Sequence, residues 1–325
     1  MKAIGIRTAG DSSQLEMVER TKPIIDAGEL LIKVAAAGVN RTDILTRERK
    51  TDAPEDVRLG VEVAGTIVQA DEKSPFKVGD AVMGLVNGGG YSEYVTMPTE
   101  RAMLIPKGLS FIAGAGIPEV FATAYQTLFW IGKLAENETV LIHAGASGVG
   151  TAAIQLAKQL KNAKVIATAG SEDKLKICRE LGADVVINYK EEAFDAVVLK
   201  ETNNRGVDLI LDFVGASYWD KNFRSASVDS RWILIGTLGG SDVKTFKISD
   251  LMQKRIHMTG TGLTPRSDDY KARLSRELIQ QTSKLFESGA MKPIIDTTFA
   301  FQYEKESHDY MEADKNICKI ILTLE

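Results

Sequence analysis

The sequence VLIHAGASGVGTAAIQLAKQL, residues 140–160, is the most informative stretch for the fold. Its first five residues form an apolar run of strand length, and a glycine turn at 145–150 leads into a segment with helical spacing of apolar side chains. In dinucleotide-binding folds such a turn brings backbone N–H groups and a helix N-terminus to a pyrophosphate. Small residues are needed because a larger side chain would occupy the phosphate's space. The stretch therefore predicts a strand, a nucleotide-binding turn and a helix.

The turn departs from the G-x-G-x-x-G pattern at one position, where Ser147 replaces the second glycine. Serine is small and its hydroxyl can donate a hydrogen bond, but the departure weakens a motif of moderate specificity. The alternative is a tight strand-to-helix turn without a ligand, and the βαβ context favours the nucleotide. A hydrolase elbow, G-x-S-x-G, is excluded because Val149 stands at its last glycine.

Strand and helix patterns alternate from about Pro118 to Pro265, which predicts a parallel sheet covered by helices. The preceding third reads as short strands separated by Gly- and Asp-rich turns, which indicates a β-rich module. After Pro265 come a helical pattern, an extended segment and a last apolar strand at 318–324. We expect this strand to return to the first module.

Composition limits the class of protein. A chain of 325 residues is long enough for two domains, and 44% hydrophobic with 26% charged residues is typical of globular proteins. The net charge of -4 offers no basic excess for nucleic acid. Cys178 and Cys318 lie far apart outside any CxxC pair, and no signal peptide or membrane span is readable. We expect a soluble, cytoplasmic protein.

The end of the second strand of the αβ region, residues 165–171, indicates which nucleotide binds. A carboxylate there would bind the ribose 2′-OH of NAD, but the strand ends at Gly170 and Ser171. These residues leave room and a donor for a 2′-phosphate, and Lys174 could meet its charge. The acidic residues at 172 and 173 would repel that phosphate unless they point outward, and Lys174 could also be a solvated helix charge. The chemistry favours NADPH over NADH.

The whole chain resembles a zinc-free member of the medium-chain dehydrogenase/reductase superfamily, of the quinone oxidoreductase type. The motifs that carry the resemblance are GVNRTD at 38–43, GVEVAG at 60–65, VGD at 78–80, GYSEYV at 90–95 and AGASGVG at 144–150. Further segments, at 117–119, 123–126, 143–145, 217–219 and 310–313, resemble the tumour-suppressor-inducible quinone oxidoreductase branch. The resemblance implies a GroES-like catalytic domain at 1–120 and 266–325, a Rossmann domain at 121–265, and a substrate cleft where they meet.

The resemblance also implies roles for individual residues in cofactor binding. The pyrophosphate would lie at Ser147, Gly148, Val149 and Gly150. The adenosine 2′-phosphate would lie among Gly170, Ser171, Lys174 and Tyr189. The nicotinamide half would be lined by Thr123, Gly236, Leu238, Gly262 and Leu263. For Tyr189 the alternative is a strand-end aromatic that only covers the sheet edge.

On the acceptor side, the resemblance implies that Asn40 faces the cleft. Members of this branch tend to carry a tyrosine in the loop that follows, where it covers the nicotinamide and the substrate. Here that loop reads RERKTD at 47–52, and Thr51 stands where an aromatic is expected. Because threonine cannot stack, we expect weaker or differently selective acceptor binding.

Zinc-dependent relatives bind their catalytic metal with a cysteine at the position of Asn40 and a histidine at that of Val61, and a structural zinc with four cysteines near 90–110. All of these are missing. His143, His257 and His308 are too scattered to form a ligand set, and each is most simply a strand or surface residue. Without a Lewis acid to lower an alcohol's pKa, we expect hydride transfer to an acceptor that is already electrophilic.

The leading hypothesis is therefore an NADPH-dependent quinone oxidoreductase without a metal. An enone or alkenal reductase is the enzymatic alternative, because the same hydride addition suits any conjugated carbonyl. An alternative of another class is a crystallin-like or RNA-binding protein, although no Lys/Arg-rich stripe supports a general RNA clamp. The segment 256–263 could pair as an exposed strand across a two-fold axis, so we expect a homodimer.

Overall fold

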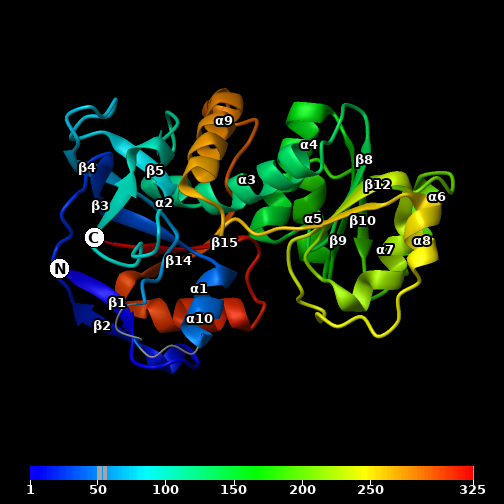
Figure 1. The fold of residues 1–325 in the computed structure, drawn as a ribbon, viewed down its shortest axis with the longest axis horizontal. Helices are drawn as coiled ribbons and strands as arrows, with labels where there is room; N and C mark the ends of the chain where they lie inside the picture. The colour runs from blue at the N-terminus through cyan, green and yellow to red at the C-terminus, as the bar shows by residue number, and fades with distance from the viewer. Residues whose placement is uncertain (50–52, 54–56, 325) are drawn as a thin grey trace. The chain divides into compact units, whose positions relative to one another are not determined.

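The computed structural model describes residues 1–49, 53 and 57–324 (Figure 1). The chain divides into two compact units. One contains Met1–Ala122 together with Arg266–Glu325, and the other contains Thr123–Pro265. Both ends of the chain therefore fold into the same unit, and the second unit is an insertion along the sequence.

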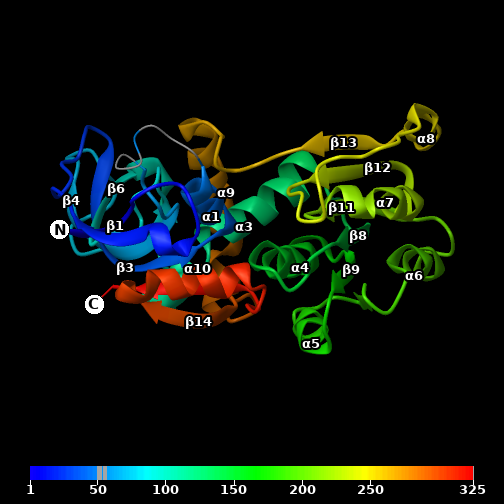
Figure 2. The same ribbon diagram turned by 90° about the horizontal axis from the view of Figure 1, so that it is seen from below.

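The inserted unit is built on a six-stranded sheet whose pairings are all parallel. The strands are β8 (Thr139–Ile142), β9 (Lys164–Ala169), β10 (Val185–Asn188), β11 (Val207–Asp212), β12 (Ala226–Leu234) and β13 (His257–Gly260). Their order is β10-β9-β8-β11-β12-β13. Figure 2 labels β8, β9, β11, β12 and β13 of this sheet. The chain starts in the middle, builds one edge and then builds the other. In this doubly wound order ligands bind at the carboxyl ends of the strands, beside the point where the order reverses.

Helices cover this sheet because its strands are apolar on both faces. The helices are α4 (Gly148–Lys161), α5 (Glu172–Glu180), α6 (Phe194–Glu201), α7 (Trp219–Ser225) and α8 (Ile248–Lys254). The core between them contains Leu141, Ile166, Ile210 and Trp232, all fully buried. The alternation predicted from the sequence is therefore confirmed.

The unit formed by the two chain ends contains a seven-stranded sheet. Its strands are β3 (Glu29–Val39), β4 (Glu62–Ala70), β5 (Ala81–Leu85), β6 (Tyr94–Pro98), β7 (Ala102–Leu104), β14 (Ile295–Ala300) and β15 (Lys319–Thr323). The order is β14-β15-β3-β4-β5-β7, with β6 paired to β3. β15 is antiparallel to β3, with Ile321 opposite Gly38, which confirms that the last strand returns to the first module. A separate hairpin pairs β1 (Lys2–Ile6) with β2 (Leu15–Glu19).

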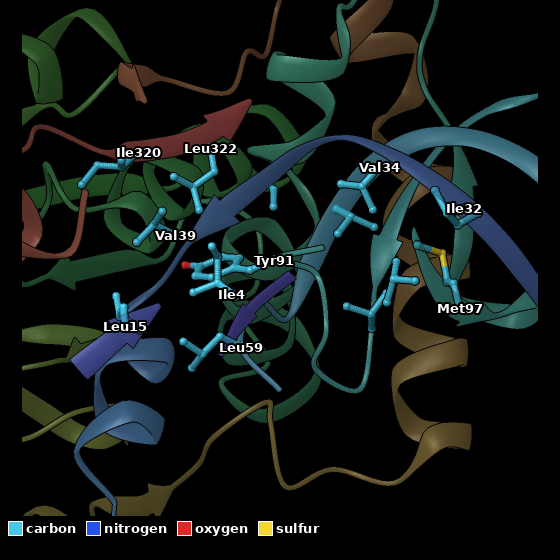
Figure 3. Close-up of a cluster of buried hydrophobic side chains, with 14 of the residues drawn as sticks. Ile4, Leu15, Ile32, Val34, Val39, Leu59, Tyr91, Met97, Ile320 and Leu322 are labelled. Atoms are coloured by element: carbon cyan, nitrogen blue, oxygen red, sulfur yellow. The ribbon is translucent and has the colours of Figure 1, made fainter. Parts of the chain in front are cut away.

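Among the described residues, α-helices also belong wholly or partly to this unit. They are α1 (Arg41–Glu48), α2 (Phe111–Ala115), α3 (Pro118–Tyr125), α9 (Asp268–Glu287) and α10 (Glu304–Glu312). Figure 3 shows buried side chains of this unit's core, among them Val34 and Val39 of β3 and Ile320 and Leu322 of β15. These two strands are nearly 300 positions apart along the chain, so the core depends on the pairing of β3 with β15.

The helix α3 leads the chain from one unit into the other and is followed by a π-helical segment, η4 (Gln126–Ile131). No helix in the described part of the chain combines the length and the apolar character needed to cross a bilayer.

Candidate functional site

The glycine turn of the inserted unit is fixed by close backbone contacts at the start of α4. The hydroxyl of Ser147 accepts a hydrogen bond from the N–H of Gly150 at 3.1 Å and so caps the helix. A Cβ atom on Gly150 would lie 2.3 Å from the carbonyl oxygen of Ala144, so only glycine fits there. The turn follows β8 beside the switch point of the sheet, where the helix N-terminus is suited to an anion.

The carboxyl end of β9 carries a second constrained glycine. A Cβ atom on Gly170 would lie 2.7 Å from the hydroxyl oxygen of Tyr189 and 3.1 Å from Cε of Lys190. Both of these side chains therefore lie against Gly170. The N–H of Tyr189 donates to the carbonyl of Ala169 at 3.2 Å, which extends the pairing of β10 with β9 to this point. The structure thus brings together Gly170 and Tyr189, two of the residues predicted for the 2′-phosphate.

Sequence reasoning missed Lys190, whose ammonium group adds a positive charge beside Gly170. Its position could have been found from the strand order, because parallel neighbouring strands end at the same edge of a sheet. A basic residue directly after Tyr189 is then expected beside the end of β9. The missing step was the pairing of β10 with β9, which the sequence alone does not reveal.

The start of α5 is arranged so that one of its acidic residues is already paired. Glu172 forms an ion pair with Arg179 at 2.5 Å, and hydrogen bonding to this guanidinium lowers the pKa of the carboxyl group. Ser171 is the N-cap residue, and its side chain makes no capping hydrogen bond. Lys174 lies in the first turn of the helix and is half-buried. The repulsion expected from Glu172 is therefore offset by Arg179.

The residues predicted for the nicotinamide half lie after the ends of neighbouring strands. Gly236 and Leu238 follow β12, whereas Gly262 and Leu263 follow β13. Leu238 is 65% exposed and Leu263 is buried. Thr123 is buried on α3. The strand order puts the first four at the carboxyl edge of the sheet, and their contacts with a cofactor stay a prediction.

A buried polar network lies under this edge and centres on His143, directly after β8. Nδ1 of His143 is 3.0 Å from the hydroxyl of Thr168, and Nε2 is 2.7 Å from Oδ1 of Asn222. The amide nitrogen of Asn222 donates to Asp212 at 3.0 Å, and so does the indole N–H of Trp232. Since Asn222 presents its oxygen to His143, Nε2 must carry the hydrogen and Nδ1 must accept from Thr168.

This network corrects the expectation that each histidine is a simple strand or surface residue. Burial lowers the pKa of His143, so the ring is neutral and both of its nitrogens are bonded. His308 is also fully buried, on α10, and only His257 is an exposed strand residue. No sequence pattern points to the partners, because Thr168, Asn222 and the histidine come from separate elements.

In the other unit, the ammonium group of Lys319 lies in a fully buried ion cluster. Nζ donates to the carbonyl of Val39 at 3.0 Å, to Oδ1 of Asn40 at 2.9 Å and to Oε1 of Glu62 at 2.6 Å. The amide nitrogen of Asn40 donates to the same Glu62 oxygen at 2.9 Å. Three ammonium protons thus meet three acceptors, and both functional atoms of Asn40 are bonded within the cluster.

A second buried carboxylate, Asp43, lies one turn along α1 from Asn40. It accepts hydrogen bonds from the N–H groups of Asn40 and Gly60, each at 2.9 Å, and from the hydroxyl of Tyr91 at 3.2 Å. Burial raises the pKa of Asp43 to about 6 even though these donors favour the charged form. The carboxylate therefore fixes the start of α1 against the glycine turn that precedes β4.

A third carboxyl group, that of Glu119, lies in the first turn of α3 beside this cluster. Its backbone N–H donates to Oε2 of Glu62 at 2.8 Å. Burial, and next the negative charge of Glu62, raise the pKa of Glu119 to about 8. We name the group of Asn40, Asp43, Glu62, Glu119 and Lys319 the carboxylate cluster. Of this group, only Asn40 was predicted from the sequence as a site residue.

Zinc does not fit this part of the chain. Asn40 and Val61 stand where zinc-dependent relatives have a cysteine and a histidine, and neither offers a thiolate or imidazole. The ammonium group of Lys319 already bonds Asn40 and Glu62, so a second cation beside it would be repelled. Across residues 1–49, 53 and 57–324, no set of three His, Cys, Asp or Glu side chains is arranged to hold a metal ion.

Comparison with known families assigns both units. The alcohol dehydrogenase GroES-like domain family matches residues 26–107, and the zinc-binding dehydrogenase family matches residues 148–280. The fold is therefore a GroES-like domain with a Rossmann-type parallel sheet, as predicted. The chain belongs to the medium-chain dehydrogenase/reductase superfamily. Its resemblance to one branch of quinone oxidoreductases rests on the sequence motifs.

Similar proteins include both predicted enzyme types. A quinone oxidoreductase of Pseudomonas syringae is 25% identical, with a TM-score of 0.88 over 99% of each chain. The CurK enoyl reductase is 26% identical, with a TM-score of 0.86 over 100% of this chain and 99% of that one. A highly reducing polyketide synthase of Aureobasidium melanogenum is 30% identical over 98% of this chain. The chain spans only 14% of the length of that synthase.

One predicted site residue, in the acceptor loop at 47–52, is not among the residues that the structure describes. Thr51 lies outside the described residues, so its proposed effect on acceptor binding stays a prediction. The neighbouring helix α1 ends at Glu48, one residue before the described segment stops.

Proposed function

We propose that this chain is an NADPH-dependent, metal-independent oxidoreductase that transfers hydride to a quinone or a related conjugated carbonyl. The observation that carries the proposal is the bonding of Lys319 to Asn40 and Glu62, which leaves a cation and an amide where a metal-dependent enzyme needs metal ligands. An acceptor that is already electrophilic needs no Lewis acid for hydride addition.

The cofactor preference is supported by the surroundings of Gly170. A residue with a side chain would collide with Tyr189 there, and the cationic side chains of Lys174 and Lys190 start from the same edge of the sheet. No carboxylate ends β9, and Glu172 is paired with Arg179. Two lysines and a hydroxyl suit the dianionic 2′-phosphate of NADPH, which NADH lacks.

When bound, NADPH would supply the hydride. The protein's part is to hold and orient it: Ser147 to Gly150 would place the pyrophosphate at the N-terminus of α4, and the residues after β12 and β13 would line the nicotinamide half. Thr123 and Asn40 complete the proposed acceptor side. The hydroxyl of Thr123 would stabilise the oxygen that becomes negative when hydride adds, because the amide nitrogen of Asn40 already donates to Gly38 and Glu62.

A conjugated enone or alkenal is the second candidate acceptor. The likeness to an enoyl reductase and to a highly reducing polyketide synthase favours it. Initial rates with NADPH should be compared on a naphthoquinone and on a simple enone. A clear preference for the quinone supports quinone reduction, and a clear preference for the enone assigns double-bond reduction.

Metal independence has a separate test. After treatment with a chelator and removal of metal, the protein should keep its NADPH-dependent activity. Stoichiometric zinc, with activity lost on its removal and restored on its return, would overturn this part of the proposal.

A crystallin-like or RNA-binding role is the alternative of another class. It would survive a loss of NADPH binding, whereas the enzymatic role would not. We also retain two expectations as proposals: a cytoplasmic protein, and a homodimer through the segment 256–263. This segment contains β13, the edge strand of the parallel sheet.

A further inference from the structure

We propose that Glu119 is a proton donor to the acceptor in the reduction. This inference rests on the proposed function and deepens it, because hydride addition to a conjugated carbonyl leaves a negative oxygen that must be protonated. The sequence resemblance implied that Asn40 faces the cleft and that Thr123 lines the nicotinamide half, whereas Glu119 emerges only from the contacts of the carboxylate cluster.

Glu119 lies on α3 between Thr123 and the buried ion pair of Glu62 with Lys319. Thr123 lies four residues further along the same helix, and side chains at this spacing share one face. At its other side, the backbone of Glu119 is bonded to Glu62, whose second oxygen is bonded to Asn40. Glu119 thus lies one turn of α3 before Thr123, the residue predicted for the nicotinamide half, and its backbone is bonded to the carboxylate that holds Asn40.

The ammonium group of Lys319 has no proton left to donate to Glu119. Its three ammonium protons go to Val39, Asn40 and Glu62, so no donor of this lysine remains for Glu119. Glu119 therefore lies beside the negatively charged carboxylate of Glu62, and Lys319, the cation paired with Glu62, has no proton left to donate to Glu119. A carboxyl group in this setting is stabilised by keeping its proton, and a protonated carboxyl is what a proton donor requires.

Charged groups from four elements act on Glu119. The negative ones are Glu62 on β4 and Asp43 on α1, and the positive ones are Lys319 on β15 and Lys271 on α9. The two lysines favour the ionised form, but burial and Glu62 outweigh them and raise the pKa of Glu119 to about 8. The group would therefore carry its proton at neutral pH and could still release it to a more basic oxygen.

The step balances without another reactant. The acceptor takes a hydride, with two electrons, from NADPH, which becomes NADP⁺. The O–H bond of Glu119 breaks, the proton forms an O–H bond on the oxyanion of the hydroquinone or enol, and Glu119 is left as a carboxylate. Lys271 lies close enough to stabilise that carboxylate electrostatically, and solvent returns the proton before the next turnover.

The first test measures protonation in the protein without cofactor. Infrared difference spectra recorded across pH should contain a carbonyl stretching band of a protonated carboxylic acid that disappears as the pH rises through about 8. The band should be missing in Glu119→Gln and present in Glu304→Gln. Glu304 is a matched control, since it is buried on α10, burial raises its pKa, and it lies outside the carboxylate cluster. A spectrum unchanged by Glu119→Gln would overturn the proposal.

The second test measures turnover. General acid catalysis typically contributes a factor of about 100 or more, so Glu119→Gln should lower kcat about a hundredfold or more and leave the Kd for NADPH unchanged. The wild-type kcat should fall as the pH rises above about 8, and this fall should be absent in the glutamine variant. Glu119→Asp, which keeps an acid, should recover part of kcat and the falling limb.

The outcomes separate this inference from the proposed function. A wild-type protein that reduces neither quinone nor enone contradicts the proposed function, whatever the infrared band shows. A wild-type protein that is active, with kcat and pH profile unchanged by Glu119→Gln, contradicts the role of Glu119 and leaves the proposed function standing. Equal losses in Glu119→Gln and Glu304→Gln would indicate a structural effect and also contradict the role.

Discussion

The glycine turn at 145–150 and the carboxylate cluster are built in opposite ways. The turn is one continuous stretch of sequence whose backbone groups would form the predicted pyrophosphate site, and its Gly150 is constrained by the carbonyl oxygens of Ala144 and Gly145, a few residues away. The cluster brings together residues from β4, β15 and the N-terminal parts of α1 and α3, and its hydrogen bond from Lys319 to Asn40 spans 279 positions. A local site is readable as a motif, whereas a site made by strand pairing is not.

The two regions also differ in how they carry charge. The turn would offer backbone dipoles to the pyrophosphate of the proposed cofactor, so without a ligand it leaves no charged group buried. The carboxylate cluster buries Lys319 against Glu62 permanently, and each charge depends on the other. Changes in the cluster should therefore act mainly on stability and proton transfer, while changes at the cofactor edge should act on binding.

The largest effect is expected from removing the cluster's cation. Lys319→Met should lower the free energy of unfolding by about 3–5 kcal/mol, because it leaves the buried carboxylate of Glu62 without its partner. Urea unfolding at pH 7 measures the change. Arg255→Met is the control, since its pair with Asp229 is exposed and should be worth at most about 1 kcal/mol.

A double variant tests the same pair more directly. Lys319→Met combined with Glu62→Gln should be more stable than Lys319→Met alone, because the unpaired charge is gone. If Lys319→Met and Arg255→Met lower the free energy of unfolding by the same small amount, Lys319 and Glu62 do not act as a buried ion pair.

The second effect concerns acid stability and His308. Burial and the nearby guanidinium of Arg47 lower the pKa of His308 from 6.5 to about 4. The unfolded chain then binds this proton more readily, so the stability is fully present above pH 6.5 and is lost as the pH falls toward 4. The loss should be on the order of 3 kcal/mol, at about 1.4 kcal/mol for each pH unit of the shift.

Unfolding curves at pH 7 and pH 4.5 check this expectation. On acidification, His308→Gln should lose less unfolding free energy than the wild type. His257 is exposed, so His257→Gln should lose as much as the wild type. An identical loss in all three proteins would show that other groups control acid stability.

The third effect concerns the carboxyl end of β9, where the 2′-phosphate of NADPH is proposed to bind. Lys174→Ala should weaken NADPH binding by roughly ten- to a hundredfold, about 1.4–2.7 kcal/mol, and leave NADH nearly unchanged, since NADH offers no 2′-phosphate. Fluorescence titration with both cofactors measures the difference. Lys176→Ala is the matched control, because residues two apart on α5 point to different sides.

Two results would contradict this prediction. Equal weakening of both cofactors by Lys174→Ala would mean that the lysine supports the fold. A wild-type preference for NADH would mean that the end of β9 does not select the 2′-phosphate.

The smallest effect is expected in the acceptor loop. Thr51→Tyr should lower the KM for a flat naphthoquinone several-fold, because stacking of one ring is worth on the order of 1 kcal/mol. Steady-state kinetics on a naphthoquinone and on a small aliphatic enone provide the comparison, since only the first offers a ring to stack on. An unchanged or higher KM for the naphthoquinone would remove this explanation of acceptor selectivity.

Features that depend on short segments could be predicted from the amino-acid sequence. Alternating apolar strands and helical patterns predicted the parallel sheet, and the turn before Thr151 located the expected pyrophosphate site. The absence of a carboxylate after Ala169 favoured NADPH over NADH. The parallel sheet was predictable because the backbone of a tight turn or a buried strand restricts its own residue types.

The meeting of distant polar groups depends on tertiary contacts that no sequence pattern shows. The pairing of β15 with β3 brings Lys319 to Asn40, and the pairing of β10 with β9 brings Lys190 to Gly170. The packing of α7 likewise supplies Asn222 to His143. A single lysine or histidine in a sequence has no periodicity to reveal its partner. Its protonation and role follow from burial and neighbouring charges, and these exist only once the strands have paired.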